Sequence, residues 1–280
     1  MTPGEISVLA DLARRRSGVV IDADKTYIIE SRLAPIARRQ GFTSLSELVQ
    51  DLQQRQDETL IWATVEALSS TETQFFRDRT PFQMIAREVL PALARKGRGA
   101  IRAWSAGCAT GQEPYSLAML AEEERGKHGP MTMEIFGSDL SERCLEKAMA
   151  GIYTQFEVQS GLPSRLLIKY FDKVDEHWVL SARIRQSVRL QRRNLMTDIK
   201  SGADGPESGP FDLILCRNVV SAFDPSTARA VLEQVAATLA PDGYLVMGAY
   251  ETSAHHTPAF RPVPGLRGLY MRDPNFRAVA

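Results

Sequence analysis

The residues best suited to chemistry lie in the segment 105–114, SAGCATGQEP, between an apolar run (101–106) and a helix-like stretch. Glycines at such a junction let the backbone approach a ligand at a helix N-terminus. Gly107 and Gly111 enclose three residues, so the fingerprint G-x-G-x-x-G is absent, and no Lys-Ser or Lys-Thr follows as in a P-loop. The loop therefore favours a nucleoside with an amino-acid tail over a phosphate ligand, with Glu113 available for the ammonium group. The alternative is a plain tight turn.

Further polar residues follow the apolar runs expected to be strands. Asp139 ends the second run, where a carboxylate can accept both hydroxyls of a ribose; the alternative is a helix N-cap. An Asn could bind an adenine edge, whereas Arg217 could simply form a surface ion pair. Since the carboxyl ends of parallel strands form the ligand-binding edge of a sheet, the same edge should hold Asn194, Leu195, Arg217 and Asn218.

Arg77 lies in the segment 69–78, SSTETQFFRD, between helical patterns. A guanidinium holds a carboxylate through two parallel hydrogen bonds, so Arg77 is a candidate for an anionic group of the ligand. Phe75 and Phe76 are equally suited to a protein core and to stacking on a cofactor.

These residues require a particular set of elements to position them. Apolar residues recur at three and four positions up to about residue 96, which predicts a helical N-terminal domain and linker over 1–96. Strand-like and helix-like segments then alternate over 97–280, which predicts an α/β domain with a parallel sheet. Short strands over 164–191 predict an inserted antiparallel β-subdomain. The last strand, within 266–271, should also be antiparallel.

Composition limits the class of protein. The 280 residues are 44% hydrophobic and 24% charged, and 34 Lys and Arg balance 34 Asp and Glu. This neutrality argues against nucleic acid as a partner. No apolar stretch approaches the ~20 residues of a membrane span, and the start lacks a secretory signal, so we expect a cytoplasmic monomer without direct membrane insertion. The three cysteines are too few for a zinc cluster without histidines at ligand spacing, so no metal is expected.

The chain resembles, over nearly its whole length, the CheR-type family of chemotaxis receptor glutamate O-methyltransferases. The resemblance rests on an ordered set of motifs, namely TETQFFRD (71–78), WSAGCATGQEPYS (104–116), SDL (138–140) and FDLILCRNV (211–219). It implies a Rossmann-like class I methyltransferase domain that uses S-adenosylmethionine (SAM) and yields S-adenosylhomocysteine (SAH). An all-helical N-terminal domain and a small antiparallel β-subdomain complete the implied fold.

The resemblance also implies roles for individual residues. Glu113 and Arg77 would hold the amino-acid part of SAM, and Arg77 would also orient the substrate carboxylate. Asp139 would hold the ribose, and the adenosine side would be contacted by Asn194, Leu195, Arg217 and Asn218. Thr71 and Thr73 would line the same pocket, although many members have asparagine at the position of Thr71.

A larger departure is Ala222, which stands where family members commonly carry a tyrosine close to the transferring methyl group. Tyr250 could supply a substitute ring. The change leaves open a non-catalytic module that binds SAM or SAH, and a methyltransferase for another substrate is a further alternative.

The implied partner is the cytoplasmic helical domain of chemotaxis receptors, whose methylation sites lie on acidic helices. Local positive charge from Arg32, Arg38 and Arg39 is expected to dock such a helix; the alternative is a solvated helix face. Some members bind a receptor tail peptide through the β-subdomain. We do not expect this here, because Asp175 to His177 form a hairpin with no glycine nearby.

Overall fold

The computed structural model describes residues 1–97, 99–129, 132–197, 210–253 and 256–277. The chain divides into two compact units, the first comprising Met1–Ser70 with Ser221–Thr227, and the second comprising Thr71–Val220 with Ala228–Ala280. No helix in these ranges is both long and apolar enough to cross a membrane.

The first unit is helical. It contains α1 (Pro3–Ser17), η1 (Ala23–Lys25), α2 (Thr26–Arg39), α3 (Leu45–Gln54) and α4 (Glu58–Leu68). Local signals fix the helix ends: Thr2 and Glu5 form a reciprocal capping box at the start of α1, and Gly18 ends α1 with a φ of 74°. The apolar faces meet in a core that includes Leu9, Leu33, Leu48 and Val65. The helical N-terminal domain expected from the sequence is therefore present.

The limits of this unit differ from the boundary expected at residue 96. The segment Ser221–Thr227 belongs to it, and the Val20 amide donates to the Ala222 carbonyl at 2.8 Å. The helical stretch α5 (Thr80–Met84), η2 (Ile85–Val89) and α6 (Leu90–Ala94) belongs instead to the second unit. The reason is burial, because Phe82, Ile85 and Leu93 pack into the core that contains the strands of that unit.

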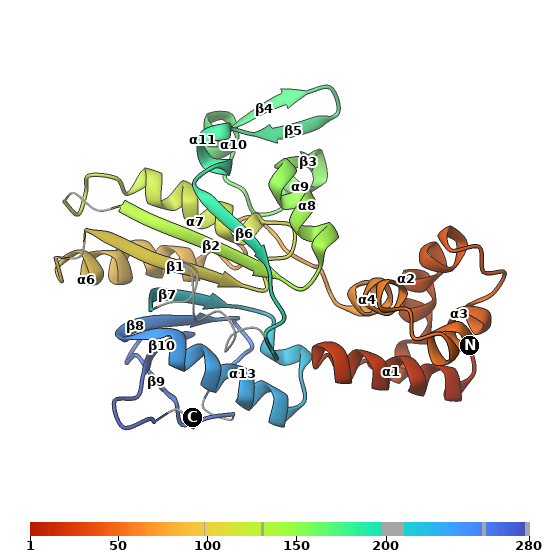
Figure 1. Ribbon diagram of the computed structural model, residues 1–280. Helices are drawn as coiled ribbons and strands as arrows, with labels where there is room; N and C mark the ends of the chain where they lie inside the picture. The colour runs from red at the N-terminus through yellow and green to blue at the C-terminus, as the bar shows by residue number, and fades with distance from the viewer. Residues whose placement is uncertain (98, 130–131, 198–209, 254–255, 278–280) are drawn as a thin grey trace. The chain divides into compact units, whose positions relative to one another are not determined.

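Among the described residues, the second unit has a seven-stranded sheet with the order β6-β2-β1-β7-β8-β10-β9 (Figure 1). Its strands are β1 (Ala100–Ala106), β2 (Thr132–Asp139), β6 (Val188–Arg192), β7 (Phe211–Cys216), β8 (Leu239–Met247), β9 (Phe260–Pro262) and β10 (Leu269–Arg272). The first five strands in this order are parallel, and β10 pairs antiparallel with β8 and β9. The Rossmann-like α/β architecture and the antiparallel last strand expected from the sequence are therefore confirmed.

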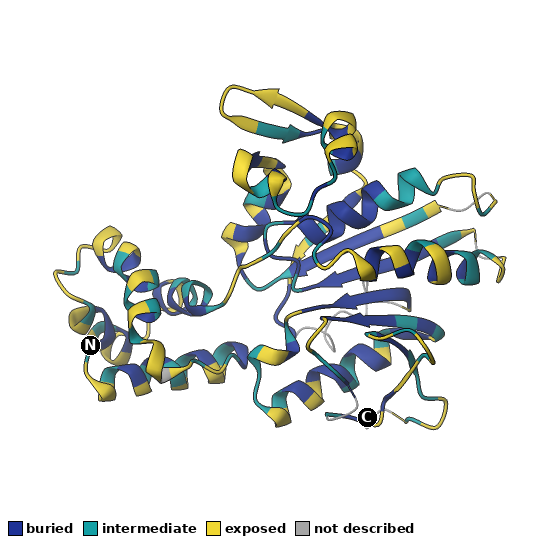
Figure 2. Ribbon diagram, turned by 180° about the vertical axis from the view of Figure 1, so that it is seen from behind, coloured by how far each residue is buried: buried dark blue, intermediate teal, exposed yellow. Residues whose placement is uncertain are grey.

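Helices cover the sheet and bury their apolar faces. α7 (Gln112–Glu123) packs on β1 and β2, α8 (Glu142–Ala150) packs on β2 and β6, and α13 (Pro225–Thr238) buries a further apolar face. Ser141 caps α8 and Asp224 caps α13, as the sequence predicted. Figure 2 shows the central strands as buried, whereas the helices keep exposed residues on their outer faces. Every residue of β7 is buried, and its sequence is apolar apart from Asp212, whose carboxylate accepts from the Arg102 amide of β1 at 2.9 Å.

The inserted β-subdomain has different limits from those predicted. In the described chain it is a three-stranded antiparallel sheet with the order β3-β5-β4, formed by β3 (Ile152–Thr154), β4 (Phe171–Val174) and β5 (His177–Leu180). The short helices α9 (Gln155–Gln159), α10 (Ser164–Tyr170) and α11 (Ala182–Arg185) accompany it. The insertion thus begins before residue 164. The assignment of 188–191 to it was wrong, because β6 pairs with β2 in the main sheet.

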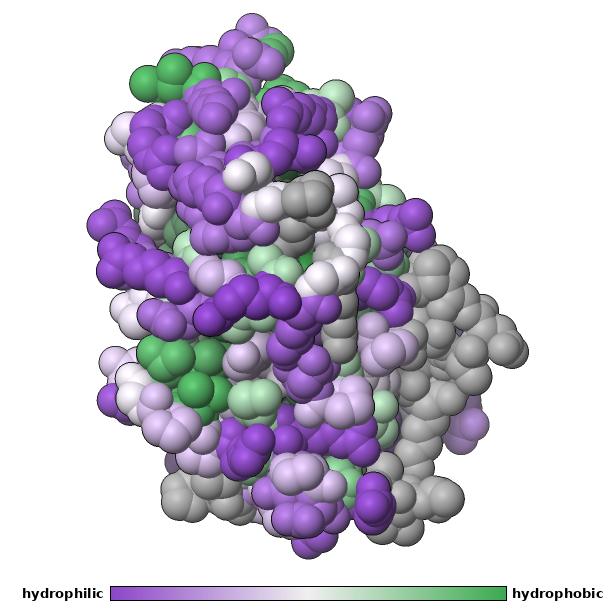
Figure 3. All heavy atoms as spheres, turned by 90° about the vertical axis from the view of Figure 1, so that its left-hand side faces the viewer, coloured by the Kyte–Doolittle hydropathy of each residue, from purple (hydrophilic) through white to green (hydrophobic). Residues whose placement is uncertain are grey.

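The parallel strands place their carboxyl ends at one edge of the main sheet. β1 lies between β2 and β7. From β1 the chain continues to β2 and β6 on one side, and it then returns to form β7 on the other side. A ligand crevice is expected outside such a switch point. The surface on the opposite side, where the amino ends of the strands lie, is mainly hydrophilic with small scattered apolar areas (Figure 3).

Candidate functional site

The loop after β1 has a backbone that requires glycine. Gly107 and Gly111 have φ values of 78° and 92°. A Cβ atom on Gly107 would lie 2.5 Å from the Val219 side chain. The loop is anchored from outside, since the Gly107 amide donates to the Ser138 carbonyl at 2.8 Å and the Tyr153 hydroxyl donates to the Thr110 carbonyl at 2.8 Å. The loop is therefore held in one shape before any ligand arrives.

Asp139, at the end of β2, is the carboxylate nearest to this loop in the hydrogen-bond network. One carboxylate oxygen accepts from the Ala109 amide at 2.8 Å and the other from the Ser141 amide at 2.9 Å. Burial raises the pKa of Asp139, and the backbone N–H donors oppose that rise. A carboxylate offers about four lone-pair sites, so Asp139 keeps acceptor capacity beside its backbone donors Ala109, Ser141 and Leu140. The helix cap itself is made by Ser141.

Asn194 and Leu195 follow β6 and lie beside the end of β2. β6 pairs in register with β2 up to Asp139, and the Arg193 amide donates to the Asp139 carbonyl at 3.0 Å. Both residues are buried, and the Asn194 side chain accepts from the Met196 amide at 3.0 Å. Asn194 and Leu195 therefore lie beside Asp139 at the carboxyl edge of the sheet, where the sequence predicted them.

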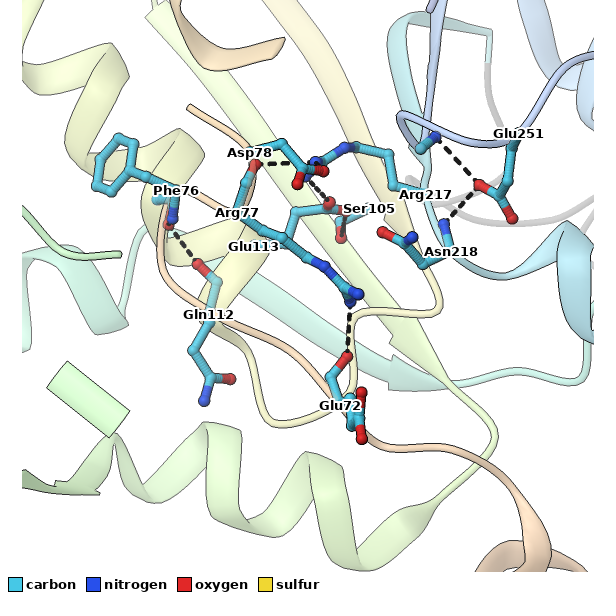
Figure 4. Close-up of polar contacts among 12 residues, drawn as sticks. Glu72, Phe76, Arg77, Asp78, Ser105, Gln112, Glu113, Arg217, Asn218 and Glu251 are labelled. Atoms are coloured by element: carbon cyan, nitrogen blue, oxygen red, sulfur yellow. Dashed lines mark hydrogen bonds and ion pairs between the residues drawn. The ribbon is translucent and has the colours of Figure 1, made fainter. Parts of the chain in front are cut away.

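Glu113, at the start of α7, belongs to an ion-pair cluster in which Glu113 and Arg217 are buried and the Asp78 side chain is 37% exposed. One oxygen of Glu113 accepts from the Ser105 hydroxyl at 2.7 Å, and the other accepts from Nη1 of Arg217 at 3.0 Å. Nη2 of Arg217 donates to the Asp78 carboxylate and to the Arg77 carbonyl, each at 2.8 Å (Figure 4). Arg217 therefore forms a buried ion pair with Glu113 rather than a surface one, and the adenosine-side role that the resemblance implies stays a prediction.

The segment that carries Arg77 is fastened to this cluster. The Phe76 amide donates to the Ser116 hydroxyl at 2.8 Å, and the Arg77 guanidinium donates to the Glu72 carbonyl at 3.0 Å. Phe75 is fully buried against Tyr153 and Phe171, which makes it core rather than a cofactor stack. The Arg77 side chain is only partly buried, so its guanidinium remains available to a ligand.

Asn218 lies at the carboxyl end of β7 with a φ of 59°, and a carboxylate missed in the sequence holds it there. One oxygen of Glu251 accepts from the Asn218 amide at 2.6 Å and from the Gly248 amide at 3.0 Å (Figure 4). This bridge joins the ends of β7 and β8. No sequence signal marks it, because Asn218 lies 33 residues from Glu251 and both partners contribute only backbone groups.

The remaining predicted residues are less closely tied to the cluster. Thr71 is exposed and Thr73 is partly buried at the start of the segment that leads to Arg77. Tyr250 follows β8 with 95% of its surface exposed, so none of the described residues covers its ring.

The three arginines expected to dock a substrate separate into two kinds. Nη1 of Arg32 donates to the Leu68 carbonyl at 2.7 Å and thereby binds the C-terminal end of α4. Arg38 and Arg39 are exposed in the last turn of α2. Arg32 therefore has a structural function, and the exposed positive charge comes from the other two.

The donor set fits SAM. Two glycines with positive φ admit a ligand beside the end of β1, the Arg77 guanidinium is partly exposed, and the partly buried Asp139 carboxylate ends β2. Nucleosides with a zwitterionic tail present the complementary groups, namely hydroxyls, an ammonium and a carboxylate.

Comparison with known proteins agrees with this geometry. The family model "CheR methyltransferase, SAM binding domain" matches residues 71–268, and "CheR methyltransferase, all-alpha domain" matches residues 4–68. "Chemotaxis protein methyltransferase 1" of Pseudomonas aeruginosa is 37% identical over 239 residues, which cover 84% of this chain and 85% of that protein. "Chemotaxis protein methyltransferase" of Escherichia coli is 32% identical over 251 residues, with coverages of 88% and 84%. The chain therefore belongs to the CheR methyltransferase family and uses S-adenosylmethionine as its methyl donor.

Proposed function

We propose that the protein transfers the methyl group of SAM to glutamate side-chain carboxylates on the cytoplasmic helical domain of chemotaxis receptors, and that it acts as a cytoplasmic monomer. The products are a glutamate methyl ester and SAH. The observation that carries the proposal is that Glu113 follows the glycine loop after β1 and Asp139 ends β2, beside each other at the carboxyl edge of the sheet, in a CheR family chain.

Each residue has a binding task in this proposal. Asp139 accepts from the ribose hydroxyls, Asn194 and Leu195 face the adenosine, and Glu113 attracts the ammonium group. Arg77, whose guanidinium is partly exposed, pairs with the carboxylate of the amino-acid part and lies where it can also orient a substrate carboxylate. Thr71, Thr73 and Asn218 complete the lining.

The reaction needs no general base. SAM supplies a methyl group that the sulfonium already activates, and a glutamate carboxylate is already ionised at pH 7. The chain therefore contributes binding, orientation and exclusion of water. Placing the two reactants in line contributes on the order of 7–11 kcal/mol to lowering the barrier.

Arg38 and Arg39 support the receptor as substrate, because their exposed charge suits an acidic helix. Reversing both charges, Arg38→Glu with Arg39→Glu, is expected to raise the receptor KM by about tenfold or more and to leave SAM affinity unchanged. The measurement is radiolabelled methyl transfer to receptor-containing membranes, with SAM affinity determined by calorimetry.

The matched control is Arg55→Glu, an exposed arginine at the C-cap of α3 that pairs with Asp51 in the same unit. An unchanged receptor KM in the double variant would remove α2 from the docking surface. A base-labile label on the receptor identifies a carboxyl methyl ester.

Ala222 supports a second candidate, a regulatory module that binds SAM or SAH without catalysis. Wild-type protein that binds SAM yet labels no receptor would favour this module.

A further inference from the structure

The ion pair of Glu113 with Arg217 opposes the role proposed for Glu113. In the proposed function Glu113 attracts the ammonium group of SAM, yet its carboxylate is already paired with Arg217 at 3.0 Å. The Arg217 side chain is only 1% exposed, so water screens its positive charge weakly. A single pair of Glu113 and Arg217 would be neutral and would offer an ammonium group little net attraction.

Asp78 resolves this conflict. Its carboxylate accepts from Nη2 of the same guanidinium at 2.8 Å. Two carboxylates on one guanidinium leave the cluster with one net negative charge. Arg77, the neighbouring cation, donates to the Glu72 carbonyl and is the group proposed to meet the ligand carboxylate.

We infer that Asp78 is a positioning residue for the amino-acid part of SAM: through Arg217 it leaves the Glu113 carboxylate free to attract the ammonium group. The inference rests on the proposed role of Glu113. Asp78 acts through Arg217 and touches no ligand atom in this account.

The backbone around Asp78 adopts unfavourable conformations that the surrounding contacts must maintain. Phe76, Asp78 and Arg79 have φ values of 49°, 66° and 45°. Such left-handed conformations cost energy in residues other than glycine and persist where the surroundings hold them. Here Arg217 holds both the Asp78 carboxylate and the Arg77 carbonyl, so the same guanidinium fixes the segment that presents Arg77.

The test compares two ligands that differ in the amino-acid part. SAH has it, whereas 5′-methylthioadenosine has the adenosine and thioether but lacks the ammonium and carboxylate. Calorimetric titration of the full chain would be made with wild type, Asp78→Asn, Asp78→Glu and the control Glu88→Gln, which removes an exposed carboxylate from η2. Asparagine keeps an acceptor for Arg217 and removes only the charge.

The expected result is that Asp78→Asn weakens SAH binding by about fivefold or more and leaves 5′-methylthioadenosine binding unchanged, because a lost charge acts on the charged part of the ligand. Asp78→Glu should recover part of the SAH affinity, and Glu88→Gln should match wild type for both ligands.

Two outcomes would overturn the inference. Equal SAH affinity in Asp78→Asn and wild type would show that the second carboxylate has no effect on the ligand. Equal weakening of both ligands would show that Asp78 only maintains the fold, and thermal melts of each variant report that loss directly. A wild type that binds 5′-methylthioadenosine but gains nothing from the amino-acid part would instead reject the proposed role of Glu113.

Discussion

At the scale of single residues, Asp139 has the clearest dependence on pH. Burial raises its pKa, so protonation begins at a higher pH than for an ordinary aspartate. Only the ionised form accepts from two ribose hydroxyls, so SAH affinity is expected to fall as pH decreases through this raised pKa. Asp139→Asn should weaken SAH binding by about tenfold at pH 7 and remove this pH dependence. Titrations of both proteins from about pH 7 downward, over the range in which the fold stays intact, measure it.

The stability of the unliganded protein should depend on pH in the opposite direction from SAH affinity. The raised pKa means that the ionised carboxylate makes the unliganded fold less stable as pH rises through that pKa, and ribose hydroxyls would offset part of the desolvation. If wild type and Asp139→Asn showed the same SAH affinity at every pH, Asp139 would serve only to hold the Ala109 and Ser141 amides.

Residue types identified part of the site in advance. Glu113 and Asp139 were predicted because each stands at a strand-to-helix junction, which is a local feature. The partners of Arg217 were not predicted, because Glu113 lies 104 residues away in the chain and Asp78 lies 139 away. Contacts over such separations depend on the fold and leave no local pattern.

At the scale of elements, Gly161 fixes the approach of the segment after α9 to the segment that carries Phe75. Its φ is 86°, and a Cβ atom there would lie 2.0 Å from the Phe75 carbonyl oxygen. Gly161→Ala is therefore expected to lower the free energy of unfolding by at least about 3 kcal/mol, because backbone must move as well as adopt a strained conformation. Urea unfolding followed by circular dichroism measures it.

Gly265→Ala is the matched control, since Gly265 has a φ of 77° but nothing within 4 Å of the added atom. It should cost only about 1 kcal/mol, the price of the left-handed conformation alone. Similar losses in the two variants would mean that the close approach of Phe75 does not matter.

The elements also show where periodicity fails. Alternation within 188–191 was correctly recognised as a strand, yet it did not reveal the partner. A short strand with one buried face looks the same whether its neighbour is parallel or antiparallel, so β6 was assigned to the β-subdomain instead of to β2. The strands β1, β2 and β7 were placed correctly because each mainly apolar run is followed by a turn and a helix signal, which is the alternation of a parallel sheet covered by helices.

At the scale of the whole molecule, each of the two units has its own apolar core, and all the residues proposed to bind SAM belong to the second. A ligand that binds one folded unit stabilises that unit by mass action. Calorimetric melting is therefore expected to show two transitions, and SAH should raise the midpoint temperature of only one. At a hundredfold excess over Kd, SAH adds about 2.7 kcal/mol to the free energy of unfolding of the unit that binds it. The transition that does not move should be the one lowered by Leu33→Ala, a change in the fully buried core of the first unit. If SAH raised both midpoints equally, the helical unit would unfold together with the SAM-binding unit, and variants in either core would then be expected to alter SAM-dependent stability.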